Sequence, residues 1–319
     1  MRSPPRAGIQ SGRWQRSRQK HYPGYREHRR KMRLAYLPAT ADTSPRDKSA
    51  STRRLRWRNP MADMSAEDHA DYLPVVRRPT LEDLKIALSK GWADFKAAPT
   101  FGLIVGGVYT FGGLLILYVV SALGYGFLGF PIMAGFALIG PYAAIALYEV
   151  SRLRERGERV SWEAMARDLT PGVMRECSYL GILLIFLLAI WLKSGAVVYA
   201  IFFGMHLLSL PAFMEALFST SSGYGFLMLG HVIGAGFAIL VFSLSVVSFP
   251  LMVDRGTDFI TALITSIRTV KLNPRLMLGW GAFIGVMLLI GFLTVFIGLM
   301  IVLPILGHTS WHLYRRVVV

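Results

Sequence analysis

The chain has 319 residues, of which 53% are hydrophobic and only 17% are charged. Soluble globular domains usually carry about 25% charged residues, so the composition excludes an ordinary water-soluble protein. The formal net charge of +16 invites a nucleic-acid-binding interpretation, but almost all of the excess lies at one end of the chain, and we expect no specific nucleic-acid partner.

The charged end is residues 1–60, which contain 17 Lys and Arg against 3 Asp and Glu. This segment lacks a sustained apolar period and cannot bury enough surface to fold, so we expect a disordered basic extension. The composition changes at Met61, where an acidic linker over residues 61–79 leads into a membrane domain over residues 80–316. We expect native translation to start at Met61. Two alternatives stay open: a native disordered tail, and a polybasic arm for anionic lipid or nucleic acid.

The first two membrane spans are predicted within residues 97–148, a run of 52 residues without a charged side chain. A helix needs about 20 apolar residues to cross about 30 Å of hydrocarbon, so the run is long enough for two helices. Several glycines and Pro131 predict a turn in the middle of the run. The spans are therefore expected near residues 100–122 and 130–150.

Length alone leaves the number of later spans open, because the 39 uncharged residues of 276–314 fit either one long helix or two short ones. Short loops rich in Lys and Arg usually lie on the cytoplasmic side of the membrane. The basic segments 151–176 and 253–275 and the C-terminal Arg315 and Arg316 are therefore expected inside. Because all of these segments are expected on the same side, an even number of spans must separate each from the next. The sequence therefore predicts six spans with both termini cytoplasmic. The last four are expected near residues 177–205, 224–252, 276–291 and 293–314.

A short amphipathic helix is predicted before each pair of spans. The first begins after Thr80, whose side chain can cap it, and its first turn is acidic. The others begin at Ser161 and Thr257. We expect all three to lie in the cytoplasmic membrane interface. The apolar face of the first consists of Leu81, Leu84, Leu88, Trp92 and Phe95. The predicted fold is thus an all-α polytopic bundle of three hairpins, each preceded by an interfacial helix.

Two features suggest how the helices are related and how they pack. The first and third units align at an offset of 175 residues, with Pro99 matching Pro274, which suggests an ancestral repeat. Gly-x-x-x-Gly spacing occurs at 102/106, 230/234 and 281/285. Small residues at this spacing let helix backbones approach closely. We interpret these glycines as internal packing positions, with a homo-oligomer contact as the alternative.

Four stretches carry a family resemblance: GWADFKAAP (91–99), AGFALIGPYAAIALYEVSR (134–152), FSLSVVSFPLMVDRGTDFITALITSIRTVKLNP (242–274) and LPILGHTSWHLYRR (303–316). Through them, residues 75–316 resemble a family of bacterial integral membrane proteins catalogued as a domain of unknown function, number 2189. The resemblance implies a multi-span fold in the inner membrane. It implies no chemistry, because that family has no assigned activity.

The sequence offers few candidate functional residues. Lys193 lies inside a predicted span, and we weigh a transport role for it against anchoring at the outer interface. His231 and His308 lie in apolar runs, as does His312, and membrane histidines can bind haem. The alternative for these histidines is a hydrogen-bonded packing role. We find no catalytic, nucleotide-binding or metal-binding motif, and therefore expect no enzymatic activity and no cofactor.

Glu149, at the inner end of the second span, is the last candidate. Like Arg315 it follows a Leu-Tyr pair, so we predict an ion pair between Glu149 and Arg315 or Arg316. The function predicted from the sequence is that of a non-enzymatic accessory or assembly factor of the bacterial inner membrane. Its partners would be the lipid bilayer and a membrane protein or a second copy of the chain. The alternatives are a small solute or ion permease and a haem-binding redox subunit.

Overall fold

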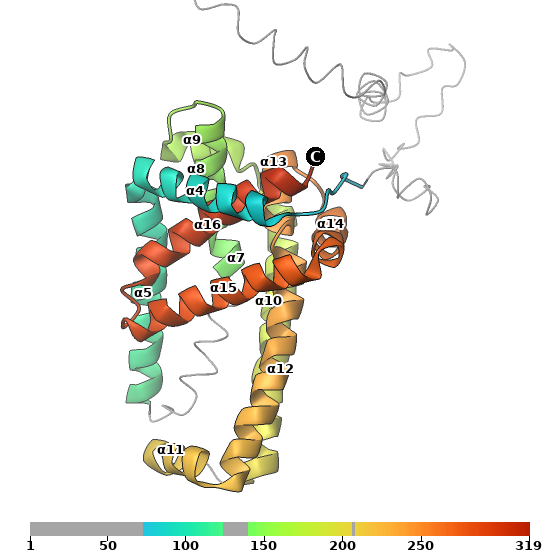
Figure 1. The fold of residues 1–319 in the computed structure, drawn as a ribbon. Coiled ribbons are helices and arrows are strands. Elements are labelled where there is room, and N and C mark those ends of the chain that lie inside the picture. Colours follow the sequence, from blue (N-terminus) through green and yellow to red (C-terminus); the bar gives the residue numbers. More distant parts are fainter. Residues whose placement is uncertain (1–72, 124–139, 206–207) are drawn as a thin grey trace, which may run out of the picture. The chain divides into compact units, whose positions relative to one another are not determined.

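A computed structural model describes residues 73–123, 140–205 and 208–319, and residues 73–319 form one compact unit. All regular elements in this part of the chain are helices, and an isolated β-bridge is the one other feature (Figure 1). The helices in chain order are α4 (Leu81–Ala97), α5 (Pro99–Ala122), α7 (Gly140–Ala143), α8 (Ile145–Glu155), α9 (Trp162–Asp168), α10 (Pro171–Phe203), α11 (Leu210–Ser219), α12 (Ser221–Ser245), α13 (Ser248–Arg255), α14 (Phe259–Leu272), α15 (Pro274–Leu293) and α16 (Leu299–Val317).

Four helical stretches of the described chain are long and apolar enough to cross a membrane. They are Pro99–Ala122, Pro171–Phe203, Ser221–Arg255 and Pro274–Leu293. Four of the predicted spans fall on these helices, and the chain is a multi-pass integral membrane protein. Of the two other predicted spans, 130–150 lies partly outside the described residues, and 293–314 falls mostly on α16, which is not among the four stretches. The count of six spans therefore stays a prediction.

The three short helices predicted from the sequence are α4, α9 and α14. Thr80 caps α4 in a reciprocal capping box with Asp83, and Ser161 caps α9, as predicted. The expected start of the third helix was wrong by one residue, because Asp258 rather than Thr257 caps α14. Each short helix is followed by a long one that begins at a proline: Pro99, Pro171 or Pro274. Proline suits this position because the first helical N–H has no intrahelical partner.

Helix α4 packs on α16 through its small and acidic side chains. Its buried residues recur at helical spacing and are Asp83, Ala87, Gly91 and Asp94. A Cβ atom at Gly91 would lie 2.7 Å from the backbone nitrogen of Thr309 in α16, so only glycine permits this approach. Leu81, Leu88 and Trp92 of the predicted apolar face are exposed instead, whereas Leu84 packs against the hydrophobic core. This is the orientation expected of a helix whose apolar face meets lipid.

The glycine pair at 102/106 also serves packing inside the chain. A Cβ atom at Gly106 would lie 2.6 Å from Cα of Met300 in α16, and one at Gly102 would lie 2.9 Å from Cβ of Pro304. The interpretation of this pair as an internal contact is confirmed. In each of the other two pairs only one glycine touches another helix: Gly234 lies against Trp191, and Gly281 lies against Phe242.

The turn between α15 and α16 lies beside the middle of α5. The Thr110 hydroxyl, halfway along α5, donates a hydrogen bond of 2.8 Å to the carbonyl of Phe296 in that turn. Val295 and Phe296 both adopt the left-handed conformation, with φ of 53° and 65°. This conformation is uncommon for non-glycine residues, so the surrounding packing must hold it.

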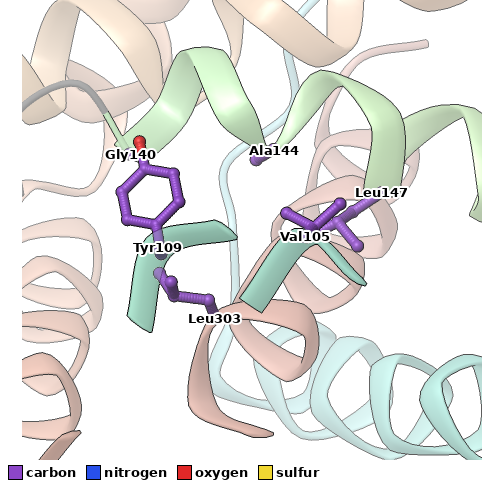
Figure 2. A pocket seen from close by; sticks show the side chains of 6 residues that line it. All are labelled: Val105, Tyr109, Gly140, Ala144, Leu147 and Leu303. Carbon is purple, nitrogen blue, oxygen red and sulfur yellow. The ribbon is translucent and has the colours of Figure 1, made fainter. Parts of the chain in front are cut away.

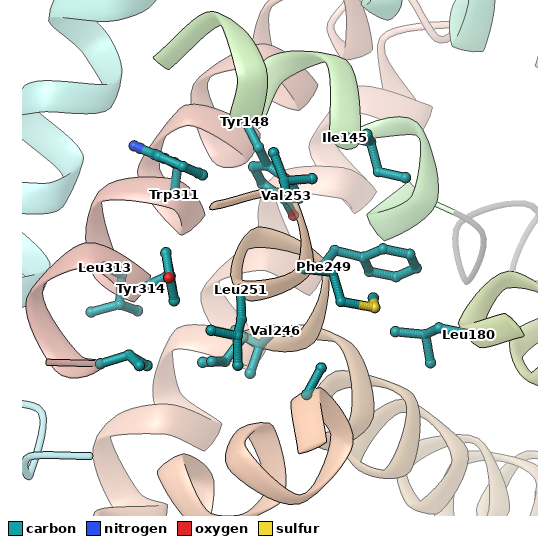
Figure 3. Close-up of a cluster of buried hydrophobic side chains, with 14 of the residues drawn as sticks. Ile145, Tyr148, Leu180, Val246, Phe249, Leu251, Val253, Trp311, Leu313 and Tyr314 are labelled. Atoms are coloured by element: carbon teal, nitrogen blue, oxygen red, sulfur yellow. The ribbon is translucent and has the colours of Figure 1, made fainter. Parts of the chain in front are cut away.

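The hydrophobic core gathers α8, α10, α13 and α16 (Figure 3). Tyr148 of α8 stacks on Trp311 of α16, with ring centroids 6.5 Å apart. Phe249 of α13 and Leu180 of α10 are fully buried in the same cluster. Polar groups adjoin this core along α8 and α16, and they form the site described below.

The C-terminus is paired with the segment that leads into α4. Val76 and Val318 form an antiparallel β-bridge, and the Val319 N–H donates to the Val75 carbonyl at 2.9 Å. The Arg77 N–H donates to the Val317 carbonyl at the same distance of 2.9 Å. Both ends of the described unit therefore lie side by side.

Candidate functional site

A buried histidine joins three helices at the C-terminal end of α16. Nε2 of His312 lies 2.7 Å from Oδ2 of Asp94 in α4, and its Nδ1 lies 3.3 Å from Oε1 of Glu155 in α8. The side chains of His312 and Asp94 are only 5% and 9% exposed. One imidazole therefore bridges two carboxylates that are far apart in the sequence.

Each of these two carboxylates also binds an arginine. Nε of Arg154 donates to the second oxygen of Asp94 at 2.8 Å, and Nε of Arg315 donates to the second oxygen of Glu155 at 3.0 Å. Nη1 of Arg315 also reaches Asp254 of α13 at 2.9 Å. We call this set the ionic clamp; its members are Asp94, Arg154, Glu155, Asp254, His312 and Arg315.

A second ion-paired group secures the two chain segments that meet at the β-bridge. Arg77 binds both oxygens of Asp83, at 2.6 and 2.8 Å, and Nε of Arg316 binds Asp83 at 2.6 Å. The hydrogen bonds from Arg77 are the main reason why the pKa of Asp83 lies far below its usual range. Asp83 therefore stays ionised, and it holds α4 to the end of α16.

The charges of the clamp stabilise one another. Burial alone would lower the pKa of His312, but the hydrogen bond to Asp94 and the attraction of Asp94 and Glu155 outweigh it, and the pKa of His312 is raised. Burial alone would likewise raise the pKa of Asp94, but His312 more than offsets this, and the pKa of Asp94 is lowered. The pKa of Glu155 is lowered in the same way, by His312 and Arg315 acting against burial.

The raised pKa of His312 predicts a pH dependence of the stability that His312 contributes. A histidine whose pKa is raised on folding contributes stability that is fully present below its unfolded pKa of about 6.5 and is lost as pH rises through the folded value. We expect His312→Gln to destabilise the protein by about 1–3 kcal/mol at pH 6. The difference from the wild type should shrink as pH rises.

Thermal unfolding of the purified protein in detergent, measured from pH 6 to pH 9, checks this expectation. His231→Gln is the control, because the ring of His231 binds only the carbonyl of Leu227 in its own helix. A difference between His312→Gln and the wild type that grows with pH would contradict the assigned charge.

Two of the candidate residues predicted from the sequence lie beside the clamp. His308 is buried, and its Nδ1 lies 2.8 Å from the Ser151 hydroxyl. Glu149 is also buried, but it pairs with Arg152 at 3.0 Å. The predicted pairing of Glu149 with Arg315 or Arg316 is wrong. Arg152, one turn away on the same helix, forms the ion pair with Glu149, whereas Arg315 forms an ion pair with Glu155.

The other two candidates lie away from the clamp. Lys193 is exposed on α10 and makes no ion pair within the described chain. His231 lies on α12 and bonds to its own helix. His308 and His312, by contrast, lie one turn apart on α16, and both interact electrostatically with Asp94. His206, also in an apolar run, lies outside the described residues.

Sequence reasoning missed Asp94, Glu155 and Asp254 as site residues. One signal for Asp94 was present, because it continues the spacing of Asp83, Ala87 and Gly91 along one face of α4. Small and acidic residues at helical spacing indicate a face that packs closely on a polar partner. No comparable local signal marks Glu155, which lies in an arginine-rich stretch, or Asp254, which follows an ordinary apolar run.

Two cavities adjoin these helices. The first, of about 20 Å³, is lined by apolar side chains of α5, α8 and α16, and by Gly140 (Figure 2). A space of this size holds about one water molecule and no ligand. The second is an open pocket of about 180 Å³ beside the clamp. Its lining residues are Lys90, Ala93, Asp94, Arg154, Glu155 and His312. No group of three metal-ligating side chains occurs in residues 73–123, 140–205 and 208–319.

Comparisons with known proteins agree with the membrane assignment. A search of curated proteins and a search of solved structures gave no match. A family model described as a predicted integral membrane protein, DUF2189, matches residues 129–254. The match runs from before α7 to the end of α13, and it includes Glu155, Asp254 and the whole of α10 and α12. Over residues 129–254 the chain is therefore similar to the predicted integral membrane proteins of family DUF2189, in agreement with the resemblance found in the sequence.

Proposed function

We propose that the protein is a non-enzymatic accessory or assembly factor of the bacterial inner membrane, which acts through contacts that its helices make within the bilayer. One observation carries the proposal: the outward side chains of the long helices are large and apolar along their length. Phe111 and Tyr118 of α5 are 68% and 71% exposed, and Ile182 of α10 is 63% exposed. Such surface is covered by lipid or by another membrane protein.

The distribution of ionisable groups favours this function over transport. A coupled transporter usually places charged or titratable groups near the middle of the membrane, facing a cavity. In the described part of the chain, buried Asp83, Asp94 and His312 are instead ion-paired within the clamp and the Asp83 group, and buried Glu149 and His308 bind Arg152 and Ser151 beside the clamp. The pairing favours a role in holding helix ends together.

Photocrosslinking tests the proposed function. A crosslinking amino acid at Phe111 or Ile182 should capture one defined membrane protein, or a second copy of the chain, in stoichiometric yield from intact cells. The same amino acid at Leu180, which is fully buried, is the control and should give no such product. Solute-dependent flux through proteoliposomes of the purified protein, with lipid adducts alone at Phe111 and Ile182, would instead favour the permease.

The same geometry supports a cytoplasmic location for both termini. Ion pairs bring together the start of the first long helix, the end of α8, the end of α13 and the end of α16. The segments that flank these four points, 77–96, 152–175, 255–275 and 315–316, carry 17 of the 18 Lys and Arg outside residues 1–60, and basic segments favour the cytoplasm. An even number of crossings must therefore separate each point from the next.

Reporter fusions are expected to reflect this topology. Fusions after residues 160, 265 and 319 should report an inner location, and fusions after 126 and 215 an outer one. A fusion after 291 should also report outside if α15 and α16 both cross. An inner signal at 291 would mean that this hairpin ends within the membrane, beside the middle of α5. An outer signal at 319 would contradict the even number of crossings between the end of α13 and the end of α16.

A further inference from the structure

The open pocket beside the clamp has a charge distribution that suits an anion. Asp94 and Glu155 supply its carboxylates, but each of their four oxygens already lies within 3.3 Å of a nitrogen of His312, Arg154 or Arg315. Lys90 is exposed at the pocket and makes no ion pair among the residues that the structure describes. Lys90 is therefore a cation of the pocket lining without a carboxylate partner in the described chain.

Arg154 has hydrogen-bonding capacity left over. It binds Asp94 through Nε, and its two terminal nitrogens have no hydrogen-bond partner within the described chain. Its side chain is 30% exposed, so these donors are accessible from the pocket. A guanidinium edge and a nearby ammonium together match the oxygens of a phosphoryl group.

The position of Lys90 on α4 indicates which side the pocket opens to. Residues two apart on an α-helix project about 200° apart, so Lys90 points almost opposite Leu88 and Trp92. Leu88 and Trp92 are exposed apolar side chains and belong to the face expected to meet lipid. Lys90 and the pocket then face the aqueous phase.

The pocket is open to solvent, so its volume sets no upper limit on the size of a ligand. About 180 Å³ is enough for a phosphoryl group with a small substituent. From the charge, the free donors and this volume we propose that the pocket formed by Lys90, Arg154 and the clamp binds a phosphoryl group. A soluble phosphate compound and a lipid headgroup share this chemistry, and the orientation of Lys90 favours the soluble compound.

Binding to the full-length protein in an uncharged detergent tests the site. The probes are inorganic phosphate, glycerol 3-phosphate and short-chain phosphatidic acid, at constant ionic strength, with calorimetry and thermal stabilisation as readouts. We expect Lys90→Gln to weaken binding about tenfold, because it removes one charge-assisted contact. Lys85→Gln is the matched control, since Lys85 is exposed on the same helix but does not line the pocket.

Each outcome has a defined meaning. Binding of the soluble phosphates that weakens in Lys90→Gln but not in Lys85→Gln supports the site and its aqueous source. Binding of phosphatidic acid alone, with the same dependence on Lys90, supports the site and assigns it to a lipid headgroup. Absence of binding by all three probes, or equal binding by both variants, overturns the proposal and leaves the proposed function untouched.

Discussion

Asp94→Ala is expected to destabilise the protein by about 3–5 kcal/mol, because it leaves the buried His312 and the partly exposed Arg154 without their shared counterion. Asp94 accepts hydrogen bonds from His312 at 2.7 Å and from Arg154 at 2.8 Å, and its side chain is 9% exposed. Loss of the carboxylate also removes the ion pair of α4 with Arg154 of α8 and its hydrogen bond with His312 of α16. The melting temperature in detergent should fall by many degrees.

A surface ion pair provides the control for this experiment. Glu158 binds Arg167 at 2.8 Å, but the two side chains are 39% and 59% exposed. Exposed pairs contribute at most about 1 kcal/mol, so Glu158→Ala should change the melting temperature little. A double-mutant cycle of Asp94→Ala with His312→Gln should show strong coupling. Equal, small effects of Asp94→Ala and Glu158→Ala would mean that the clamp does not hold the fold.

Gly106→Ala is expected to cost about 1–3 kcal/mol, because the added methyl group cannot be accommodated without separating α5 from α16. The new Cβ would lie 2.6 Å from Cα of Met300 and 2.7 Å from its carbonyl oxygen. Both are backbone atoms, so no side chain can rotate away to make room. The thermal stability of the variant in detergent measures the cost.

Gly285→Ala is the matched control, since a Cβ there has nothing within 4 Å. Glycine is less favourable than alanine in a helix by about 1 kcal/mol, so this change should be neutral or slightly stabilising. If Gly106→Ala were as stable as Gly285→Ala, the contact of α5 with α16 would be looser than the structure has it. Impaired assembly in Gly285→Ala alone would indicate an oligomer contact at that face.

Local chemistry allowed much of the helix pattern to be predicted. Thr80 and Ser161 begin helices because their side chains accept the free N–H groups of the first turn, and Pro99 and Pro274 begin helices because proline fits the first position. These effects act within a few residues. They can therefore be recognised in a sequence without knowledge of the tertiary structure.

The clamp could not be predicted in this way. Asp94 and His312 are separated by 218 residues, and no local rule pairs them. The prediction for Glu149 had the correct pair of helices, α8 and α16, but the wrong register along α8. Glu149 and Glu155 lie on different turns of α8, and only the packing angle of α16 determines which of them meets Arg315. Such an angle depends on side chains from several helices together.

The clamp and the glycine contacts also determine when the fold can be completed during synthesis. Helix α16 supplies partners for Asp83, Asp94 and Gly106, and Arg316 follows Asp83 by 233 residues. At about 5–20 residues per second, the ribosome needs on the order of 10–50 s to make the intervening chain. During this time Asp83 and Asp94 have only Arg77 and Arg154 as ionic partners, and Gly106 lacks its contact with Met300. A chain that stops before residue 299 lacks α16, so Gly106 and the second partners of Asp83 and Asp94 would stay exposed on α4 and α5.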